Sequence, residues 1–131
     1  MATVPLLDDE AAGAEARAVF DDIRAKRQTD YVNNFWRALA NDPALLAATW
    51  ERLQQVMAPG ALDPLVKELI YVAVSVANGC KYCTHSHTAA ARAKGMTEAM
   101  HAELLAVIGM ASQTNALATA LQVPTDDRFK V

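Results

Sequence analysis

Apolar residues recur along most of this chain with the period of an α-helix, and polar turn signals separate the periodic segments. Residues 8–27 form the first such segment, which begins with an acidic pair suited to a helix N-terminus. Its apolar positions follow a spacing of three or four residues and are Ala16, Val19, Phe20 and Ile23. The pattern predicts a helix over residues 8–27 that buries one apolar face.

Two Asp-Pro pairs mark the starts of the next long helices. Aspartate is a preferred N-cap and proline is favoured at the first helical position, so residues 42–43 and 63–64 each predict a helix start. The first of these helices should end near Met57. The second should end at the Asn-Gly pair of residues 78–79, which is a good left-handed stop. The run YVAVSV at 71–76 could be taken for a strand, but the cap signals on both sides favour a helix.

A short apolar piece at 35–40 follows a polar loop, and two further helices are predicted beyond the Asn-Gly pair. One covers about residues 80–94, and the other covers about residues 97–121 with a candidate break at 112–115. No strand, glycine-rich phosphate loop or internal repeat is evident in the sequence. We therefore expect an all-α fold, a compact bundle of about five to seven helices that forms a single domain over residues 1–131.

Composition narrows the possible functions. Apolar residues make up 53% of the chain and charged residues 21%, with a net charge of −3, as in an ordinary globular protein without a nucleic-acid footprint. The N-terminal residues lack the basic start of a secretory signal. The longest apolar stretch, 69–77, is shorter than the ~20 residues that span a bilayer. We therefore expect a cytoplasmic protein that is not in a membrane. In the reducing cytoplasm, a cysteine pair is more often catalytic or metal-binding than structural.

Both cysteines and two of the three histidines lie within residues 78–87, NGCKYCTHSH. Residues three, four and seven positions apart share a helix face, so Cys80, Cys83 and His87 are expected to form one stripe. His85 emerges on another side and is expected to be structural or solvent-facing. The stripe could bind a metal, could cycle between dithiol and disulfide, or could be a chance cluster in a helical core.

The dipole at the helix N-terminus is too weak to make these thiols reactive by itself, so a neighbouring base is required. A free thiol has a pKa of ~8.5, and a helix dipole contributes ~0.3–1 kcal/mol, less than the ~1.36 kcal/mol that shifts a pKa by one unit. His87, one turn beyond Cys83, is placed to act as the base. A disulfide between positions i and i+3 of a helix must distort the first turn, because relaxed disulfides hold their Cβ atoms ~3.8 Å apart. The pair is therefore expected to form an easily reduced disulfide.

Glu68 is the lone carboxylate at the head of the apolar run that precedes the cluster. It could orient a histidine and hold its proton, as in Cys–His–acid arrangements. It could equally be an early-helix glutamate that is stabilised by the helix dipole. Spacing alone leaves both interpretations open.

Glu68, eleven intervening residues and then Cys-x-x-Cys-x-x-x-His resemble the signature of the alkylhydroperoxidase D-like branch of the carboxymuconolactone decarboxylase superfamily. The similarity covers roughly residues 33–110. It implies an all-α fold that assembles into trimers or hexamers, and a peroxidase that needs neither cofactor nor metal. It also implies that Cys83 attacks the peroxide, that Cys80 is the resolving partner, and that Glu68 and His87 relay protons.

One residue departs from the resemblance. The best-known members of the family carry a second relay histidine between the cysteines, where this chain has Tyr82. A tyrosine, with a pKa of ~10, is a poor base near neutral pH. Either the helix end activates Cys80, or the protein is a weaker peroxidase with another preferred substrate. We expect organic hydroperoxides or hydrogen peroxide as substrates, and an external thiol or dithiol donor of the thioredoxin-like or lipoyl type as reductant.

Three alternatives stay open at this point. Cys80, Cys83, His87 and Glu68 could bind zinc, although zinc ligands usually come from separate segments rather than from one helix. The decarboxylases of the superfamily act on a lactone from aromatic breakdown, but they generally lack the cysteine pair. A non-catalytic oligomeric protein could retain its cysteines as small buried residues. The aromatic residues expected to anchor the core or a subunit interface are Phe35, Trp36 and Trp50.

Overall fold

The computed structural model describes residues 1–130, and the regular elements in that range are six α-helices and one short 3₁₀ turn. The predicted all-α class is therefore confirmed, with a helix number inside the expected range. The helices divide between two compact units, Met1–Ala58 and Pro59–Val131. That the chain forms one domain stays a prediction.

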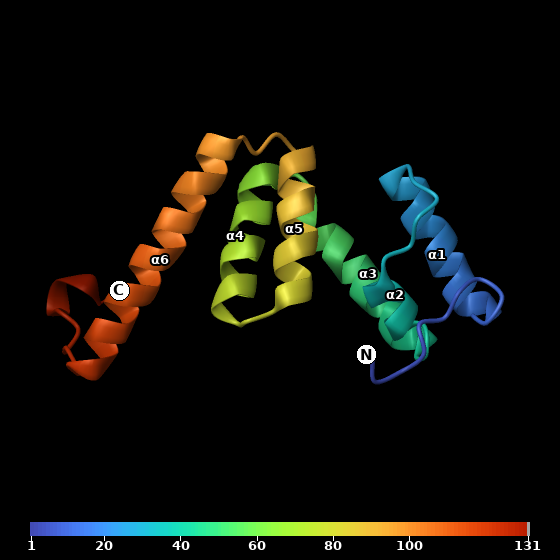
Figure 1. Ribbon diagram of the computed structural model, residues 1–131, viewed down its shortest axis with the longest axis horizontal. Coiled ribbons are helices and arrows are strands. Elements are labelled where there is room, and N and C mark those ends of the chain that lie inside the picture. Colours follow the sequence, from blue (N-terminus) through green and yellow to red (C-terminus); the bar gives the residue numbers. More distant parts are fainter. Residues whose placement is uncertain (131) are drawn as a thin grey trace. The chain divides into compact units, whose positions relative to one another are not determined.

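Unit 1 contains α1 (Ala14–Arg27), α2 (Asn34–Leu39) and α3 (Pro43–Met57), drawn from blue to green in Figure 1. Asp42 caps α3 by accepting a hydrogen bond from the backbone N–H of Leu45 at 3.1 Å, as the Asp-Pro pair predicted. The apolar faces of the three helices meet in one core, which consists of Ala12, Ala16, Phe20, Ile23, Val32, Trp36, Ala40, Leu46 and Trp50. Three of the four core positions predicted for the first helix are therefore buried, and the fourth, Val19, is partly buried against the cluster. Both tryptophans are buried, whereas Phe35 is exposed.

The first helix begins later than its sequence pattern predicted. The side chain of Asp8 accepts hydrogen bonds from the backbone N–H groups of Glu10 and Ala11, at 3.1 and 2.9 Å, and so closes a separate turn. Gly13 then occupies the N-cap position of α1. The prediction of a helix from residue 8 was wrong because an aspartate can stabilise a local turn as readily as a helix start.

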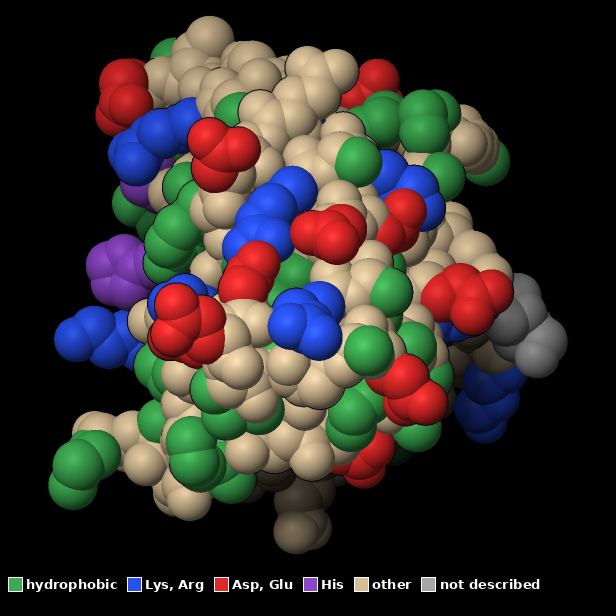
Figure 2. All heavy atoms as spheres, turned by 90° about the vertical axis from the view of Figure 1, so that its right-hand side faces the viewer, with side chains coloured by type: hydrophobic (Ala, Val, Ile, Leu, Met, Phe, Trp, Pro, Cys, Tyr) green, Lys and Arg blue, Asp and Glu red, His purple; other side chains and the backbone are tan. Residues whose placement is uncertain are grey.

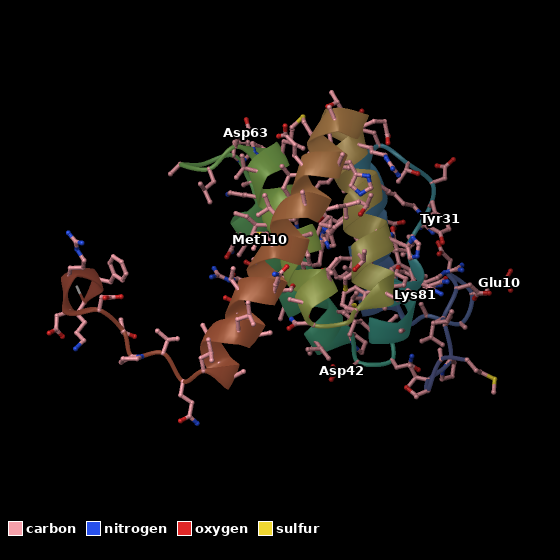
Figure 3. The ribbon with its side chains drawn as sticks, turned by 60° about the vertical axis from the view of Figure 1, so that its left-hand side comes forward. Glu10, Tyr31, Asp42, Asp63, Lys81 and Met110 are labelled. Carbon is pink, nitrogen blue, oxygen red and sulfur yellow. The ribbon has the colours of Figure 1, made fainter. Side chains whose placement is uncertain are left out.

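Unit 2 contains α4 (Pro64–Ala77), α5 (Lys81–Ala93), α6 (Glu98–Ala120) and the 3₁₀ turn η1 (Asp127–Phe129). Figure 1 shows α4 and α5 side by side and antiparallel, joined by a short connection. Asp63, labelled in Figure 3 at the start of α4, caps that helix through a 2.9 Å hydrogen bond from the backbone N–H of Leu65. Gly79 adopts a φ of 68°, the left-handed conformation that the Asn-Gly pair predicted.

The last long helix, α6, is continuous through residues 112–115, so the candidate break there was wrong. It packs against α4, yet none of its residues is buried. Met110, labelled about halfway along α6 in Figure 3, is one of several exposed apolar side chains of this helix. The others with large exposed fractions are Leu105, Val107 and Leu117. The helix thus presents an apolar surface that unit 2 itself does not cover.

One face of the molecule carries charged side chains of both signs (Figure 2). On the face shown in Figure 2, acidic and basic side chains are interspersed, in keeping with the small net charge of −3. No helix within residues 1–130 is both long enough and apolar enough to cross a membrane.

Candidate active site

The helical hairpin of α4 and α5 carries all four of the predicted site residues. Glu68 lies on α4, Cys83 and His87 lie on α5, and Cys80 occupies the N-cap position of α5. The tight connection positions the first cysteine, because the backbone N–H of Cys80 donates a 2.9 Å hydrogen bond to the carbonyl of Ser75 on α4. The hairpin therefore supplies every candidate group from one locally folded segment.

Cys80 stands just outside the helix rather than in its first turn. Its backbone is extended, with φ −82° and ψ 92°, and its Sγ accepts a hydrogen bond from the backbone N–H of Cys83 at 3.3 Å. Of the three residues expected to share one face of a helix, only Cys83 and His87 lie within α5. Cys80 precedes the helix as its N-cap residue. The expected distortion of the first turn presupposed two helical cysteines, and Cys80 is not helical. An easily reduced disulfide stays a prediction.

The two thiols differ in acidity. A hydrogen bond from the Cys83 side chain, together with the backbone N–H groups at the helix start, lowers the pKa of Cys80. Burial, followed by the hydrogen bond and negative charge of Cys80, raises the pKa of Cys83 to about 11. Cys80 is therefore the more acidic of the two thiols, and Cys83 can form a thiolate near neutral pH only if a base removes its proton.

Glu68 and His87 form a close pair across the hairpin. Glu68 is only 4% exposed, and its Oε2 lies 2.7 Å from His87 Nδ1. Burial pushes the pKa of Glu68 up, but hydrogen bonds from His87 and Lys94 outweigh burial and the net pKa is lowered. The carboxylate of Glu68 therefore stays ionised at neutral pH and orients the imidazole of His87, the geometry that the first of the two interpretations of Glu68 required.

Tyr71 and Lys94 also contact this pair, although no sequence pattern predicted a role for either. The ring of Tyr71 stacks on the ring of His87, with centroids 3.5 Å apart and planes at 16°. Lys94 Nζ lies 2.7 Å from Oε1 of Glu68. Tyr71 could have been found from its position three residues after Glu68 on α4. Lys94 could have been found from the antiparallel hairpin, which sets the end of α5 beside the start of α4.

The other two histidines of the chain and Tyr82 are at least partly exposed. His85 and Tyr82 are exposed, and His101 is half-buried on α6, in keeping with the expectation that His85 is not part of the relay. Within residues 1–130 no group of three or more His, Cys, Asp or Glu side chains is arranged to hold a metal ion.

Three comparisons with known proteins identify the family of this chain. The profile of the carboxymuconolactone decarboxylase family matches residues 43–126. The alkyl hydroperoxide reductase AhpD of Solibacter usitatus (strain Ellin6076) is 37% identical over 91 residues, which are 70% of this chain and 50% of that protein. The chain thus spans half the length of this curated relative.

A solved structure agrees over the whole chain. The crystal structure of the alkylhydroperoxidase AhpD core from Rhodospirillum rubrum ATCC 11170, at 1.95 Å resolution, is 66% identical and superimposes with a TM-score of 0.96. The match covers 100% of this chain and 98% of that one. The similarity includes the α4–α5 hairpin on which the candidate site is built.

Proposed function

Because this chain belongs to the carboxymuconolactone decarboxylase family, in its alkylhydroperoxidase D-like branch, we propose that it is a thiol-dependent peroxidase. The substrates would be organic hydroperoxides or hydrogen peroxide, and the working groups Cys80, Cys83, Glu68 and His87. One observation carries the proposal: a buried carboxylate, 2.7 Å from an imidazole, lies on the same helical hairpin as two adjacent free thiols.

Because the pKa of Cys83 is raised, a base must remove its thiol proton before the sulfur can react. A thiol with a pKa of about 11 carries almost no thiolate at neutral pH, yet the thiolate is the nucleophile. His87 lies one helical turn after Cys83, within the range where side chains on a helix meet. Its imidazole, oriented by Glu68, accepts the thiol proton as the sulfur approaches the peroxide.

The proposed reaction balances in two steps. The Cys83 thiolate attacks the terminal oxygen of R–O–OH, the O–O bond breaks, and the leaving alkoxide takes the proton from His87 as R–OH. Cys83 is left as a sulfenic acid. The thiolate of Cys80 then attacks the Cys83 sulfur and expels hydroxide, which is protonated to water, so that a Cys80–Cys83 disulfide forms. The lowered pKa of Cys80 suits this second step, since it increases the thiolate fraction of the resolving sulfur.

An external donor must return two electrons for each turnover. Two thiols of the donor are oxidised to its disulfide while the Cys80–Cys83 disulfide is reduced to two thiols. Cys80 stands outside the helix at its N-terminal end, so we propose it as the sulfur that a thioredoxin-like or lipoyl-type dithiol attacks. Such donors operate in a reducing compartment, and we propose the cytoplasm.

We also propose that the chain works as a homo-oligomer, a trimer or a hexamer. The uncovered apolar side chains of α6, among them Val107 and Met110 at 65% and 54% exposure, support association with further copies of the chain. Light scattering at micromolar concentration is expected to give one of these assemblies. A stable monomer would exclude this part of the proposal.

The decisive test counts free thiols by mass spectrometry before and after one equivalent of an organic hydroperoxide, with metal analysis of the same sample. The proposal expects two free thiols before, none after, and recovery of both with a mild dithiol. The matched control is His85→Asn, which removes an exposed histidine of the same helix and should leave the count unchanged. Thiols inert to peroxide in a sample that contains stoichiometric zinc would favour the metal alternative. Inert thiols without metal would favour a decarboxylase or a non-catalytic protein.

A further inference from the structure

Glu68 has two partners, and each occupies one of its oxygens. Oε2 meets His87 Nδ1 and Oε1 meets Lys94 Nζ, both at 2.7 Å. With both partners in place, the Glu68 side chain is only 5% exposed. Lys94 is the cation of this group, and its side chain is 39% exposed.

The fold holds Lys94 in this place by ending α5 there. The backbone N–H of Lys94 donates to the carbonyls of Ala90 and Ala91, and Gly95 then turns the chain with a φ of 103°. The buried Met96 secures the chain beyond the turn, since its backbone N–H donates to the Ala91 carbonyl at 2.9 Å. Lys94 is thus at a fixed helix end rather than on a free loop.

An ionised carboxylate can only accept hydrogen bonds, whereas a protonated one can also donate. The state of Glu68 therefore decides which atom of its pair with His87 carries the hydrogen. If Glu68 is a carboxylate, Nδ1 of a neutral His87 must donate, and Nε2 keeps its lone pair. If Glu68 is protonated, its O–H can donate to Nδ1, and the ring hydrogen moves to Nε2.

We propose that Lys94 is a positioning residue that holds Glu68 as a carboxylate, so that His87 donates from Nδ1 and keeps Nε2 free to accept a proton. Without Lys94, the buried charge of Glu68 has two ways to be compensated. Glu68 takes up a proton and the histidine hydrogen moves to Nε2, or His87 takes up a proton and both ring nitrogens carry hydrogen. Either way Nε2 no longer accepts a proton. Stacking on Tyr71 restrains the ring plane in each case.

The catalytic consequence rests on the proposed peroxidase function, but the ring-nitrogen state does not, and NMR measures it directly. Protein labelled with ¹⁵N-histidine is recorded near neutral pH, and the signals are assigned with His85→Asn and His101→Asn. Wild type is expected to show hydrogen on Nδ1 and none on Nε2. Lys94→Met should show hydrogen on Nε2, whereas Lys94→Arg, which keeps the cation, should restore the wild-type pattern.

Arg92→Met is the matched control, because it removes the same charge two residues earlier on α5 from a residue that pairs with Glu98 at 3.6 Å. It should leave the His87 signals as in wild type. Hydroperoxide consumption by Lys94→Met should fall about 10²-fold, the scale of a lost general base, while Lys94→Arg and Arg92→Met should stay near wild type.

The outcomes separate the two proposals. Unchanged His87 nitrogen signals in Lys94→Met overturn the role of Lys94, whatever the peroxidase assay gives. Wild-type protein with hydrogen on Nε2 overturns it as well, even if Lys94→Met does not fold. If the nitrogen pattern follows the expectation but wild-type protein does not consume hydroperoxide, Lys94 keeps its role and the peroxidase proposal fails.

Discussion

The two units of the chain use burial in different ways. Unit 1 buries nine apolar residues in one cluster and no polar residue. Unit 2 buries the apolar residues Val72, Ala91 and Met96 and, within residues 1–130, both of the buried polar residues, Glu68 and Ser75. Unit 1 is therefore held by side-chain packing, whereas unit 2 places a charged group in its interior. The region that carries the candidate chemistry is the one with the thinner apolar core.

The charged groups of the two units also differ in how deeply they are buried. In unit 1, Arg24 holds Asp9 through two hydrogen bonds of 2.8 and 2.7 Å, and the hydrogen bond with Arg24 lowers the pKa of Asp9. Asp9 is about half exposed, at 48%, where ion pairs contribute little to stability. Glu68 has comparable distances but lies in the interior. Position, rather than bond length, makes one pair a surface contact and the other a candidate site.

The largest expected effect concerns the cysteines of unit 2. Cys83→Ser should abolish the fast reaction with hydroperoxide, because no sulfur remains where His87 can accept the proton. Cys80→Ser should still consume about one equivalent and stop at a sulfenic acid on Cys83. Stopped-flow measurement of peroxide, with dimedone trapping and mass spectrometry, distinguishes the two variants. If Cys83→Ser keeps the fast phase and Cys80→Ser loses it, the roles are reversed, and the helix end rather than His87 is the main activator.

The second effect tests whether packing alone supports unit 1. Phe20 is fully buried in the core cluster, so Phe20→Ala should lower the free energy of unfolding by about 3–5 kcal/mol through lost contacts and a cavity. Tyr31→Ala removes an aromatic side chain that is 59% exposed, and should change stability by no more than about 0.5 kcal/mol. Urea denaturation followed by circular dichroism measures both. Equal losses would contradict the contrast between core and surface in unit 1.

The third effect tests the buried charge of unit 2. Glu68→Gln removes the ion pair with Lys94 and the charged acceptor of the His87 hydrogen bond, and should cost on the order of 2 kcal/mol at neutral pH. This is less than for a fully buried pair because the Lys94 side chain is partly exposed. The folded-state pKa of Glu68 lies below its ordinary value of 4.5. Its stabilising contribution is therefore complete above that value and is lost as the pH falls through the lowered pKa.

Denaturation of wild type and Glu68→Gln at a series of pH values measures this contribution. Their difference in unfolding free energy should be constant above pH 4.5 and should shrink in more acidic solution. A difference that does not change with pH would mean that the carboxylate of Glu68 contributes through its shape and not through its charge.

The sequence predicted most of the helices, because their caps are local. Asp42 and Asp63 make the expected capping hydrogen bonds, and Gly79 adopts the expected left-handed turn. The start of α1 was misplaced, since Asp8 satisfies backbone groups of its own turn before Gly13. Capping residues thus predict a helix boundary well, unless the same polar side chain can instead hydrogen-bond to the backbone of a separate turn.

The site was predicted less completely, because its contacts cross from one helix to another. Helical spacing brought Cys83 and His87 together, and the resemblance added Glu68, but spacing alone left the role of Glu68 open. Lys94 is 26 positions from Glu68, so no helical period connects them. Cys80 lies outside α5 because its own backbone is extended, and no sequence pattern specified this conformation. The difference in pKa between the two thiols depends on this position.

The smallest expected effect concerns unit 1, where the buried ring of Trp50 hydrogen-bonds to a charged group. Trp50 is 6% exposed, and its Nε1–H donates to Asp22 Oδ2 at 2.7 Å. Lys26 binds the same oxygen at 2.8 Å, and the bonds from Lys26 and Trp50 lower the pKa of Asp22. Trp50→Phe should therefore cost about 1 kcal/mol for the hydrogen bond, since Lys26 still satisfies the carboxylate, with a further cost for the smaller ring.

A double-mutant cycle separates these two costs. The same Trp50→Phe change in an Asp22→Ala background removes ring volume but no hydrogen bond, so the difference between the two costs measures the bond alone. A coupling of about 1 kcal/mol would show that unit 1 uses polar contacts only as a supplement to packing. A coupling as large as the effect of Glu68→Gln would instead mean that a partly exposed carboxylate contributes as much as the buried one. The two units would then not differ in how they use charge.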